Sequence, residues 1–305
     1  MNQIQAIRDR SLWAATPRTR GYIMAFVGTT LWANTAILGG YLMRHYTIGP
    51  LGVAFWRNLV VAITLVGLLA VWRPAELRLN RADFRFFMIG GAIGIGLSNA
   101  VFFYSVQLNG AAVATVIVFI APALVAIGAR FLFDEPLTRI KLISLGLSLV
   151  GCVLVSDVLN LARPFFNPAG ILVGLLSGVT FAAYSLFGKR AIAHNDPWKT
   201  TAYFFVFGTA LLFFMQPPDQ FFSMGAELPA WALLIVLGAG PTLGGYALYT
   251  ASLRDLPASV ASLVSSLEPA LTALLAFLFL GERMSLIQIM GGAMVVGAVA
   301  LLSWD

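Results

Sequence analysis

The chain has 305 residues, of which 59% are hydrophobic and only 10% are charged, and its mean hydropathy is +0.87. About a quarter of the residues in a water-soluble domain are charged, so this composition excludes a soluble globular protein and indicates that lipid is the solvent. The formal net charge is +6 at pH 7. The linkers between apolar segments carry this charge, so a nucleic-acid partner is not needed to explain it.

Ten mostly apolar segments follow one another along the chain, each about long enough to cross a bilayer core of about 30 Å. The linkers between them are short, which leaves no room for a soluble catalytic or nucleotide-binding domain. We therefore predict an all-α membrane protein with ten transmembrane helices. The predicted spans are residues 21–42, 49–72, 84–105, 111–130, 139–156, 169–188, 200–216, 229–251, 258–280 and 286–304.

The cations lie mostly in alternate linkers. With the N-terminus in the cytoplasm, 15 of the 19 Lys and Arg residues fall on the cytoplasmic side, three fall outside, and Arg57 lies within a span. The positive-inside rule then predicts that both termini are cytoplasmic. Residues 1–20 are polar and basic and lack the apolar stretch of a cleavable signal, so the first span is expected to act as its own insertion signal.

Residues Gly91–Ser156 repeat without a gap at Gly238–Ser303, an offset of 147. The first spans match more weakly at an offset of 149. Because five spans per unit is an odd number, the second unit is expected to enter the membrane inverted. The predicted organisation is a cytoplasmic segment 1–20, a first five-helix repeat 21–157, a periplasmic linker 158–168 and an inverted second repeat 169–305.

The repeat pairs Glu135 with Glu282, in two linkers of different charge. Arg130, Arg139 and Lys141 surround Glu135, whereas neutral residues take their places around Glu282. This exchange of cations for neutral residues agrees with an inversion that moves the linker across the membrane. Glu135 is therefore expected in a cytoplasmic turn and Glu282 in an external one.

Four motifs stand out in the repeats: the run Pro122-Ala-Leu, the helix end Phe131–Glu135, the run Leu267–Ala270 and the run Phe277–Glu282, which a Gly-rich last helix follows. They resemble the drug/metabolite transporter superfamily, in its EamA-type ten-helix branch. Within this branch the chain is most similar to bacterial aromatic amino-acid exporters. The resemblance implies a central cavity lined by spans one to four and six to nine, with spans five and ten packed outside it.

Two prolines, Pro122 and Pro269, lie in the middle of predicted spans. Each lacks the N–H that would bond the carbonyl four residues back, so the helices are expected to bend and to free the carbonyls of Val118 and Ser265. One interpretation is a pair of hinges that let each repeat close one end of a shared cavity. The alternative is curvature that serves helix packing alone.

Two charged side chains lie inside apolar spans. A buried carboxylate such as Glu268 costs several kcal/mol unless it is protonated or paired. Glu268 is a candidate for binding a substrate ammonium group or for proton uptake in coupled export, and a structural hydrogen bond is the alternative. Arg57 is a candidate for binding a carboxylate, and the alternative is a long stem that snorkels to the outer headgroups.

Aromatic and small polar side chains in the spans would give such a cavity an apolar wall with a few hydrogen-bonding groups, which suits a flat hydrophobic solute. Packing against helices or lipid is the alternative for any one of them. The predicted substrate-binding residues are Trp32, Asn34, Trp56, Arg57, Asn99, Phe102, Phe119, Phe181, Tyr184, Tyr246, Tyr249, Ser265 and Glu268.

Catalysis and cofactor binding have little support in the sequence. Cys152 is the only cysteine, and His45 and His194 fall in linkers predicted on opposite membrane faces, so no metal site is expected. Gly188-Lys189-Arg190 lacks the glycine spacing and hydroxyl of a phosphate loop. We predict a protein that is not an enzyme and needs no cofactor.

These observations predict a secondary carrier in the bacterial inner membrane that works by alternating access. Its expected solutes are small amphipathic metabolites, above all aromatic or hydrophobic amino acids, and export is the expected direction. The alternative is a cationic-drug or nucleotide-sugar carrier of the same superfamily. An intramembrane enzyme, a channel or a membrane receptor is a more distant alternative.

Overall fold

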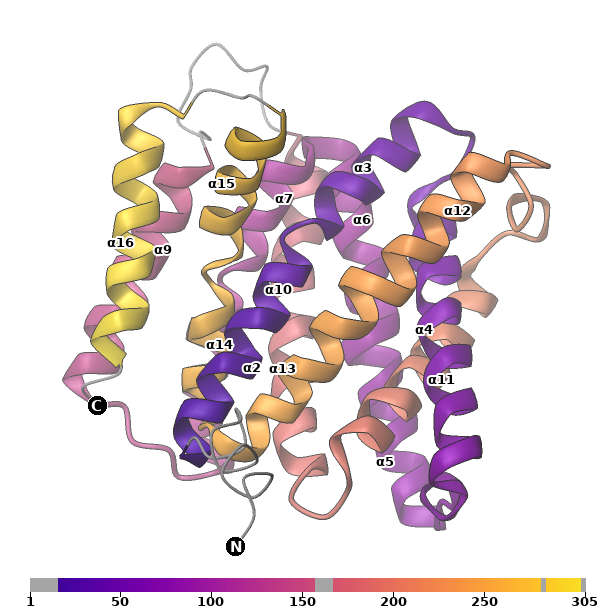
Figure 1. The fold of residues 1–305 in the computed structure, drawn as a ribbon, viewed down its shortest axis with the longest axis horizontal. Coiled ribbons are helices and arrows are strands. Elements are labelled where there is room, and N and C mark those ends of the chain that lie inside the picture. The colour runs from indigo at the N-terminus through magenta and orange to yellow at the C-terminus, as the bar shows by residue number, and fades with distance from the viewer. Residues whose placement is uncertain (1–15, 157–166, 281–283, 303–305) are drawn as a thin grey trace, which may run out of the picture.

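The structure, a computed structural model, describes residues 16–156, 167–280 and 284–302. Within these residues the chain forms helices joined by turns, with no strand. The helices stand side by side in one bundle (Figure 1). The predicted all-α class is confirmed for this part of the chain.

The helices before residue 157 include a π-helical segment, η3, that joins α5 to α6 without interruption. Their bounds are α2 (Pro17–Trp32), α3 (Thr35–His45), α4 (Pro50–Trp72), η2 (Pro74–Leu77), α5 (Arg81–Gly91), η3 (Ala92–Leu97), α6 (Ser98–Asn109), α7 (Ala111–Val118), α8 (Ala121–Leu132) and α9 (Arg139–Val155).

The helices after residue 166 include a second π-helical segment, η5, between α12 and α13, and they begin with one continuous helix where the first half has α2 and α3. Their bounds are α10 (Pro168–Ala191), α11 (Pro197–Met215), η4 (Pro218–Gln220), α12 (Leu228–Leu237), η5 (Gly238–Thr242), α13 (Leu243–Asp255), α14 (Ala258–Ser265), α15 (Glu268–Leu280) and α16 (Leu286–Leu302).

Local signals explain where several helices begin. The side chain of Asn167 accepts hydrogen bonds from the first amides of α10, and the Asp196 side chain accepts one from Trp198 N at 2.8 Å. A proline follows each of these caps, at Pro168 and Pro197, where its missing N–H costs no helical bond.

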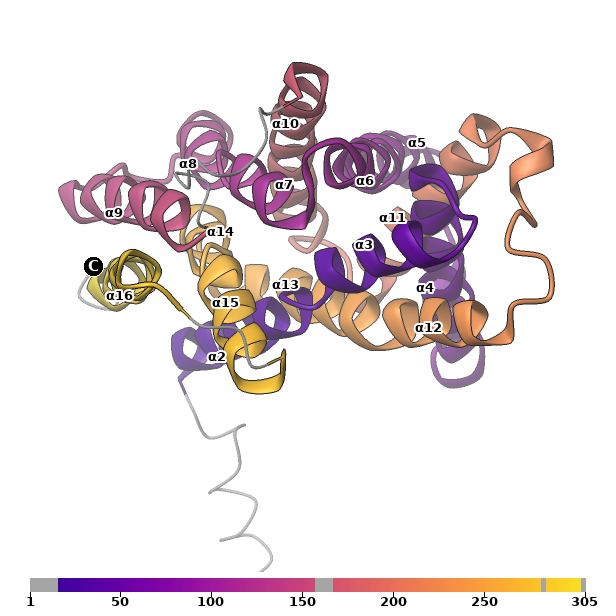
Figure 2. The same cartoon turned by 90° about the horizontal axis from the view of Figure 1, so that it is seen from above.

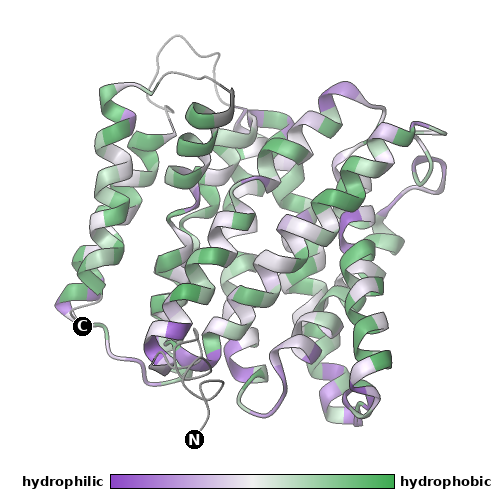
Figure 3. Cartoon of the chain, in the orientation of Figure 1, coloured by the Kyte–Doolittle hydropathy of each residue, from purple (hydrophilic) through white to green (hydrophobic). Residues whose placement is uncertain are grey.

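The bundle belongs in a membrane. Seven helical stretches are long and apolar enough to cross a bilayer, and α16 is a shorter apolar helix. Hydrophilic residues gather at the two ends of the bundle while apolar residues cover its middle (Figure 3). The chain is therefore a multi-pass helical membrane protein.

One of the seven stretches, Arg81–Leu132, has 52 residues and is too long for a single crossing. At 1.5 Å per residue it would extend about 78 Å, more than twice the bilayer core. The chain instead turns at Gly110, whose φ of +82° is open to glycine. As a result α6 and α7 pack against each other.

Backbone irregularities recur at the repeat offset. α7 ends at Val118 and α8 begins at Ala121, and 147 residues later α14 ends at Ser265 and α15 begins at Glu268. The two predicted bends at the prolines are thus complete breaks, because Pro122 and Pro269 each stand at the start of a new helix. The prediction that these spans are irregular at the prolines is confirmed.

α9 and α16 lie together at one edge of the bundle (Figures 1 and 2). Their backbones approach so closely that a Cβ on Gly151 would come within 2.8 Å of the carbonyl oxygen of Gly291. This edge is where the family resemblance places spans five and ten. The other helices surround the space between the repeats.

We name the end of the bundle that holds Pro17, Asp255 and Leu302 the terminal end. There Arg20 of α2 forms a bidentate ion pair with Asp255 of α13, with N···O distances of 2.7 and 2.8 Å. The sequence predicts that this end faces the cytoplasm.

Glu135 forms a second polar contact between the repeats at the terminal end. Its carboxylate accepts hydrogen bonds from Ala258 N at 2.7 Å, from Ser259 N at 3.1 Å and from the Ser259 hydroxyl. Glu135 lies in the linker between α8 and α9 and is buried there, because it satisfies the first amides of α14.

Candidate functional site

A cavity lies between the repeats, at the level of the helix breaks. Its volume is about 60 Å³, enough for a few water molecules. Nine of the thirteen predicted binding residues line it: Trp32, Arg57, Asn99, Phe102, Phe119, Phe181, Tyr246, Ser265 and Glu268, together with Thr35, Ser98, Val118 and Ser177.

Aromatic rings form one wall of the cavity. The Trp32 ring meets Phe181 edge-on with centroids 5.6 Å apart, and meets Tyr246 edge-on at 4.9 Å. Such edge-to-face contacts are favourable for aromatic pairs. The wall is thus held in place by its own ring contacts, while other ring surface remains toward the cavity.

Arg57 supplies the only positive charge among the residues that line the cavity. The side chain is 1% exposed and its Cζ lies 4.8 Å from the ring centroid of Phe103. Its position on α4 is therefore internal, and the alternative in which it snorkels to the headgroups is wrong. The cation–π contact offsets only part of the cost of burying this charge.

Several hydrogen-bond donors around Arg57 have no partner among the described residues. They are Nε and Nη2 of Arg57, and Nε1 of Trp32. The buried Thr35 hydroxyl is also without a partner. Each unsatisfied buried group costs about 1–3 kcal/mol, so this cluster is suited to an anionic acceptor that enters the cavity.

Glu268 is the only acidic side chain among the lining residues. It stands at the first position of α15, where the positive end of the helix dipole favours a carboxylate. Glu268 and Arg57 interact electrostatically across the cavity, but no ion pair within 4.0 Å joins these two residues. The two charges are therefore both available to a solute.

Asn99 and Tyr246 occupy equivalent positions in the two repeats and touch each other. Tyr246 Oη donates to Asn99 Oδ1 at 3.1 Å, and Asn99 Nδ2 donates to Asn58 Oδ1 at 3.1 Å. Residues at equivalent positions of the two repeats thus contact each other, and both line the cavity.

Comparison with known proteins identifies the family. The model of the EamA-like transporter family matches twice, over residues 19–157 and 168–304. The chain belongs to the EamA-like transporter family. A membrane transport function follows from this membership.

Relatives of this EamA-like protein cover most of its length. An uncharacterized transporter of Archaeoglobus fulgidus is 28% identical over 77% of this chain and 78% of its own. The uncharacterized inner membrane transporter YicL of Salmonella typhimurium is 23% identical over 94% and 96%. A solved crystal structure superposes with a TM-score of 0.79 at 18% identity, over 94% of this chain and 97% of the other, which shows a shared fold.

Four predicted binding residues of the EamA-like chain do not line the cavity. Tyr184 and Tyr249 are fully buried behind it, where their hydroxyls bond Thr250 and Ser185. Trp56 donates from Nε1 to the carbonyl of Phe221 at 2.8 Å. Asn34 lies at the break between α2 and α3 and donates to the carbonyl of Thr30. Helical spacing placed these side chains in the right spans but on faces that pack.

Sequence reasoning missed three lining residues and the break that exposes one of them. Thr35 reaches the cavity because α2 ends at Trp32 and α3 begins at Thr35. Ser98 and Ser177 line it together, and the Ser177 hydroxyl bonds the Ser98 carbonyl at 3.4 Å. Ser98 adjoins the predicted Asn99, but no proline or charge in the sequence marks Thr35 or Ser177.

Proposed function

We propose that this EamA-like protein is a secondary carrier that exports small amphipathic metabolites, above all aromatic or hydrophobic amino acids, by alternating access. Ten membrane crossings, cytoplasmic termini and the bacterial inner membrane are parts of this proposal. One observation carries the choice of solute. A single cavity between the repeats combines Arg57 and its unpartnered donors, the carboxylate of Glu268 and a wall of aromatic rings.

An amino-acid zwitterion matches these groups in charge and in kind. Its carboxylate would accept hydrogen bonds from Arg57 Nε and Nη2 and from Trp32 Nε1, which lack acceptors. Its ammonium group would face Glu268. A flat apolar side chain would pack on Phe102, Phe119 and Phe181.

The small volume of the cavity supports a transport cycle with moving helices. About 60 Å³ is far below the roughly 300–1,000 Å³ of a pocket that encloses a small organic molecule. Solute binding therefore requires the walls to move apart. The breaks before Pro122 and Pro269 interrupt two of the walls, so we assign these positions as hinges about which each repeat opens one end.

The carbonyls freed by the prolines add acceptors at the same place. Pro122 and Pro269 have no N–H to donate to Val118 and Ser265, and both of these residues line the cavity. These acceptors, together with Glu268, favour an ammonium group over a second carboxylate. They also explain why broken helices meet at the cavity, since exposed backbone at membrane depth is tolerated where it lines one.

Counterflow in liposomes tests this proposal. Purified protein is reconstituted in vesicles loaded with unlabelled phenylalanine, and uptake of labelled phenylalanine is measured against vesicles without protein. Saturable accumulation above equilibrium is expected, since a carrier exchanges its solute and a channel does not. If no amino acid in a panel of aromatic, aliphatic and charged members gives counterflow, the solute assignment is wrong.

The alternative carriers make different demands on the cavity. A nucleotide sugar brings several negative charges, and Arg57 is the one cation among the lining residues. A cationic drug would use Glu268 and the aromatic rings but would leave Arg57 without an acceptor. Competition in the counterflow assay by a uridine diphosphate sugar or by tetraphenylphosphonium would favour the corresponding alternative.

A further inference from the structure

A wide groove opens at the terminal end, away from the central cavity. It lies between α2 and α13 on one side and the adjoining ends of α4 and α11 on the other, and its volume is about 600 Å³. A second groove of about 270 Å³ adjoins it and shares Arg73 and Trp198 with it. The two grooves thus meet at Arg73 and Trp198.

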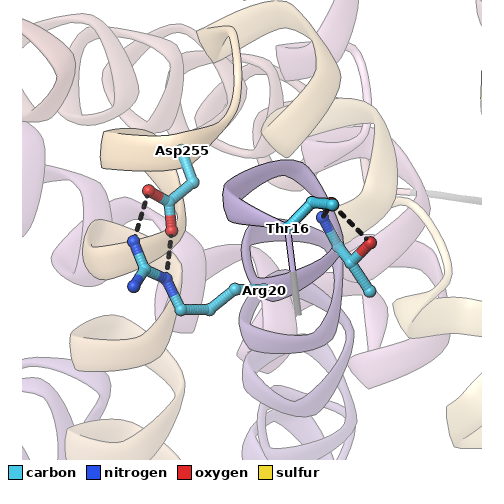
Figure 4. A network of polar contacts seen from close by, with 4 residues as sticks. Thr16, Arg20 and Asp255 are labelled. Carbon is cyan, nitrogen blue, oxygen red and sulfur yellow. Dashed lines mark hydrogen bonds and ion pairs between the residues drawn. The ribbon is translucent and has the colours of Figure 1, made fainter. Parts of the chain in front are cut away.

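The polar part of the wider groove has an excess of positive charge. Arg20 is paired with Asp255 (Figure 4), and Arg73 is paired with Asp196 at 3.2 Å. Arg254 also lines the groove and forms no ion pair with a described residue. Three cations and two carboxylates leave a charge of +1 that an anion would neutralise.

Apolar walls extend from these charges toward the middle of the membrane. In the wider groove Val27 lies seven residues from Arg20, and Leu248 lies seven residues from Asp255, or about 10 Å at 1.5 Å per residue. In the narrower groove Leu65 lies eight residues from Arg73, or about 12 Å. Both grooves therefore begin at the charges and continue as apolar channels.

The exposed aromatic residues of the grooves place them at the edge of the bilayer. Trp198 is 44% exposed and Trp72 is 73% exposed at the terminal end. Exposed tryptophans at the ends of membrane helices lie at the level of the lipid headgroups. The charged part of the groove is thus at headgroup depth, and the apolar channels are at the depth of acyl chains.

We propose that these paired grooves bind one anionic diacyl phospholipid, with its phosphate at Arg254 and Arg73 and one acyl chain in each groove. The excess charge selects an anion, the two apolar channels match two chains, and Trp198 stands between them. Because α2 and α4 belong to the first repeat and α11 and α13 to the second, the lipid contacts both repeats. The assignment does not depend on which solute the carrier transports.

Native mass spectrometry tests the site. The purified full-length protein in detergent is titrated with dioleoyl phosphatidylglycerol, dioleoyl phosphatidylcholine and glycerol 1-phosphate. One cation at a membrane surface contributes about 1 kcal/mol to binding of an anionic lipid, or about a fivefold change in affinity. Phosphatidylglycerol is therefore expected to bind about fivefold more tightly than phosphatidylcholine, and glycerol 1-phosphate, which has no acyl chains, is not expected to compete.

Variants locate the binding in the grooves. Arg254→Ala is expected to lower the affinity for phosphatidylglycerol about fivefold, to the level of phosphatidylcholine, while Arg254→Lys keeps it within twofold. Arg190→Ala is the matched control, because Arg190 is an exposed arginine at the same end that lines neither groove. Ala251→Trp fills the wider groove and is expected to weaken the binding of both lipids.

Three results would overturn the proposal. Equal affinities of the two lipids for the wild-type protein would show that the charge selects nothing. Equal losses in Arg254→Ala and Arg190→Ala would show a diffuse surface effect. Displacement of the lipid by glycerol 1-phosphate would show a site for a soluble phosphate compound rather than for a membrane lipid.

Discussion

The two repeats share most of their backbone irregularities and carry different charges. Each has a π-helical segment, η3 or η5, whereas the break between α2 and α3 has no counterpart in the continuous α10. The breaks before Pro122 and Pro269 stand at an offset of 147. Pro50 and Pro197 begin α4 and α11 at the same offset, so Phe204 is the equivalent of Arg57 in the second repeat. Ala121 is the counterpart of Glu268. Each charge of the cavity thus has an apolar equivalent in the other repeat.

The features that the repeats share shape the cavity, and the features that they do not share determine its charges. The shared breaks and the contact between Asn99 and Tyr246 bring both repeats to the cavity. The unshared Arg57 and Glu268 give that cavity a positive and a negative side. In the proposed carrier, this difference would hold an asymmetric solute in one orientation, and a movement of one repeat against the other would change the distance between Arg57 and Glu268.

Removal of Arg57, the charge contributed by the first repeat, is expected to have the largest effect on transport. Arg57→Met deletes the groups that would bind the solute carboxylate. Hydrogen bonds to a charged group contribute about 1.5–3 kcal/mol, so the half-saturating concentration of phenylalanine in counterflow should rise about tenfold to hundredfold. Phenylethylamine, which has no carboxylate, should compete equally well against the variant and the wild type.

Arg130→Met is the control for the loss of an arginine. Arg130 lies outside the cavity and its side chain is half exposed, at the margin of ion-pair distance from Asp134. This variant should transport like the wild type. An unchanged half-saturating concentration in Arg57→Met would show that Arg57 serves the fold alone.

Weakening the contact between the repeats at Glu135 is expected to have the next largest effect. Glu135→Gln replaces charge-assisted hydrogen bonds to the first amides of α14 by weaker neutral ones. The terminal end should therefore open more often. The equivalent Glu282 lies outside the described residues, so this prediction concerns the contact of the first repeat alone.

A cysteine at the cavity reports this opening. In a background of Cys152→Ala, Ser265→Cys places a thiol at the cavity, and a membrane-impermeant thiol reagent is applied from the terminal side. Glu135→Gln should raise the labelling rate about tenfold, since a change of 1.4 kcal/mol shifts an equilibrium tenfold. Asp134→Asn is the control because that neighbouring carboxylate is 97% exposed. Equal labelling of the two variants would contradict the prediction.

Removal of the charge contributed by the second repeat should have a smaller effect. Glu268→Gln keeps an acceptor oxygen for the solute ammonium group and loses only the charge, so we expect about a fivefold rise in the half-saturating concentration of phenylalanine. Phenylpropionate, which has no ammonium group, should compete equally against variant and wild type. Counterflow at two pH values separates the other candidate role, because a residue that takes up protons makes transport depend on pH and its amide does not.

Repetition in the sequence predicted much of the fold. The offset of 147 and the prolines located the irregular fourth and ninth spans, and the isolated charges Arg57 and Glu268 pointed to the cavity. These features are readable because a charge inside an apolar helix is costly and rare, and because a proline there removes a helical hydrogen bond. The burial of Glu135 had no signal in the sequence, since only its contact with α14, 123 residues away, accounts for it.

The sequence could not predict how each helix is rotated about its own axis, and so which of its side chains face the cavity. Tyr184 and Tyr249 are aromatic and lie three residues after the cavity-lining Phe181 and Tyr246, yet they face packed neighbours. The apolar helices of a membrane protein have no polar face to mark which side points inward. The break that admits Thr35 has no proline or charge to signal it.

Loss of the hydrogen bond between Tyr246 and Asn99 should have the smallest effect, and it tests the contact between equivalent positions of the two repeats. Tyr246→Phe removes the hydroxyl that donates to Asn99 and leaves the ring that meets Trp32. A neutral hydrogen bond contributes about 0.5–1.5 kcal/mol, so the half-saturating concentration of phenylalanine should rise about threefold. Tyr203→Phe loses a similar bond, from its hydroxyl to the carbonyl of Leu77, outside the cavity. Tyr203→Phe should lower thermal stability without changing counterflow. An equal effect of both variants on counterflow would mean that the hydrogen bond between Tyr246 and Asn99 only stabilises the fold.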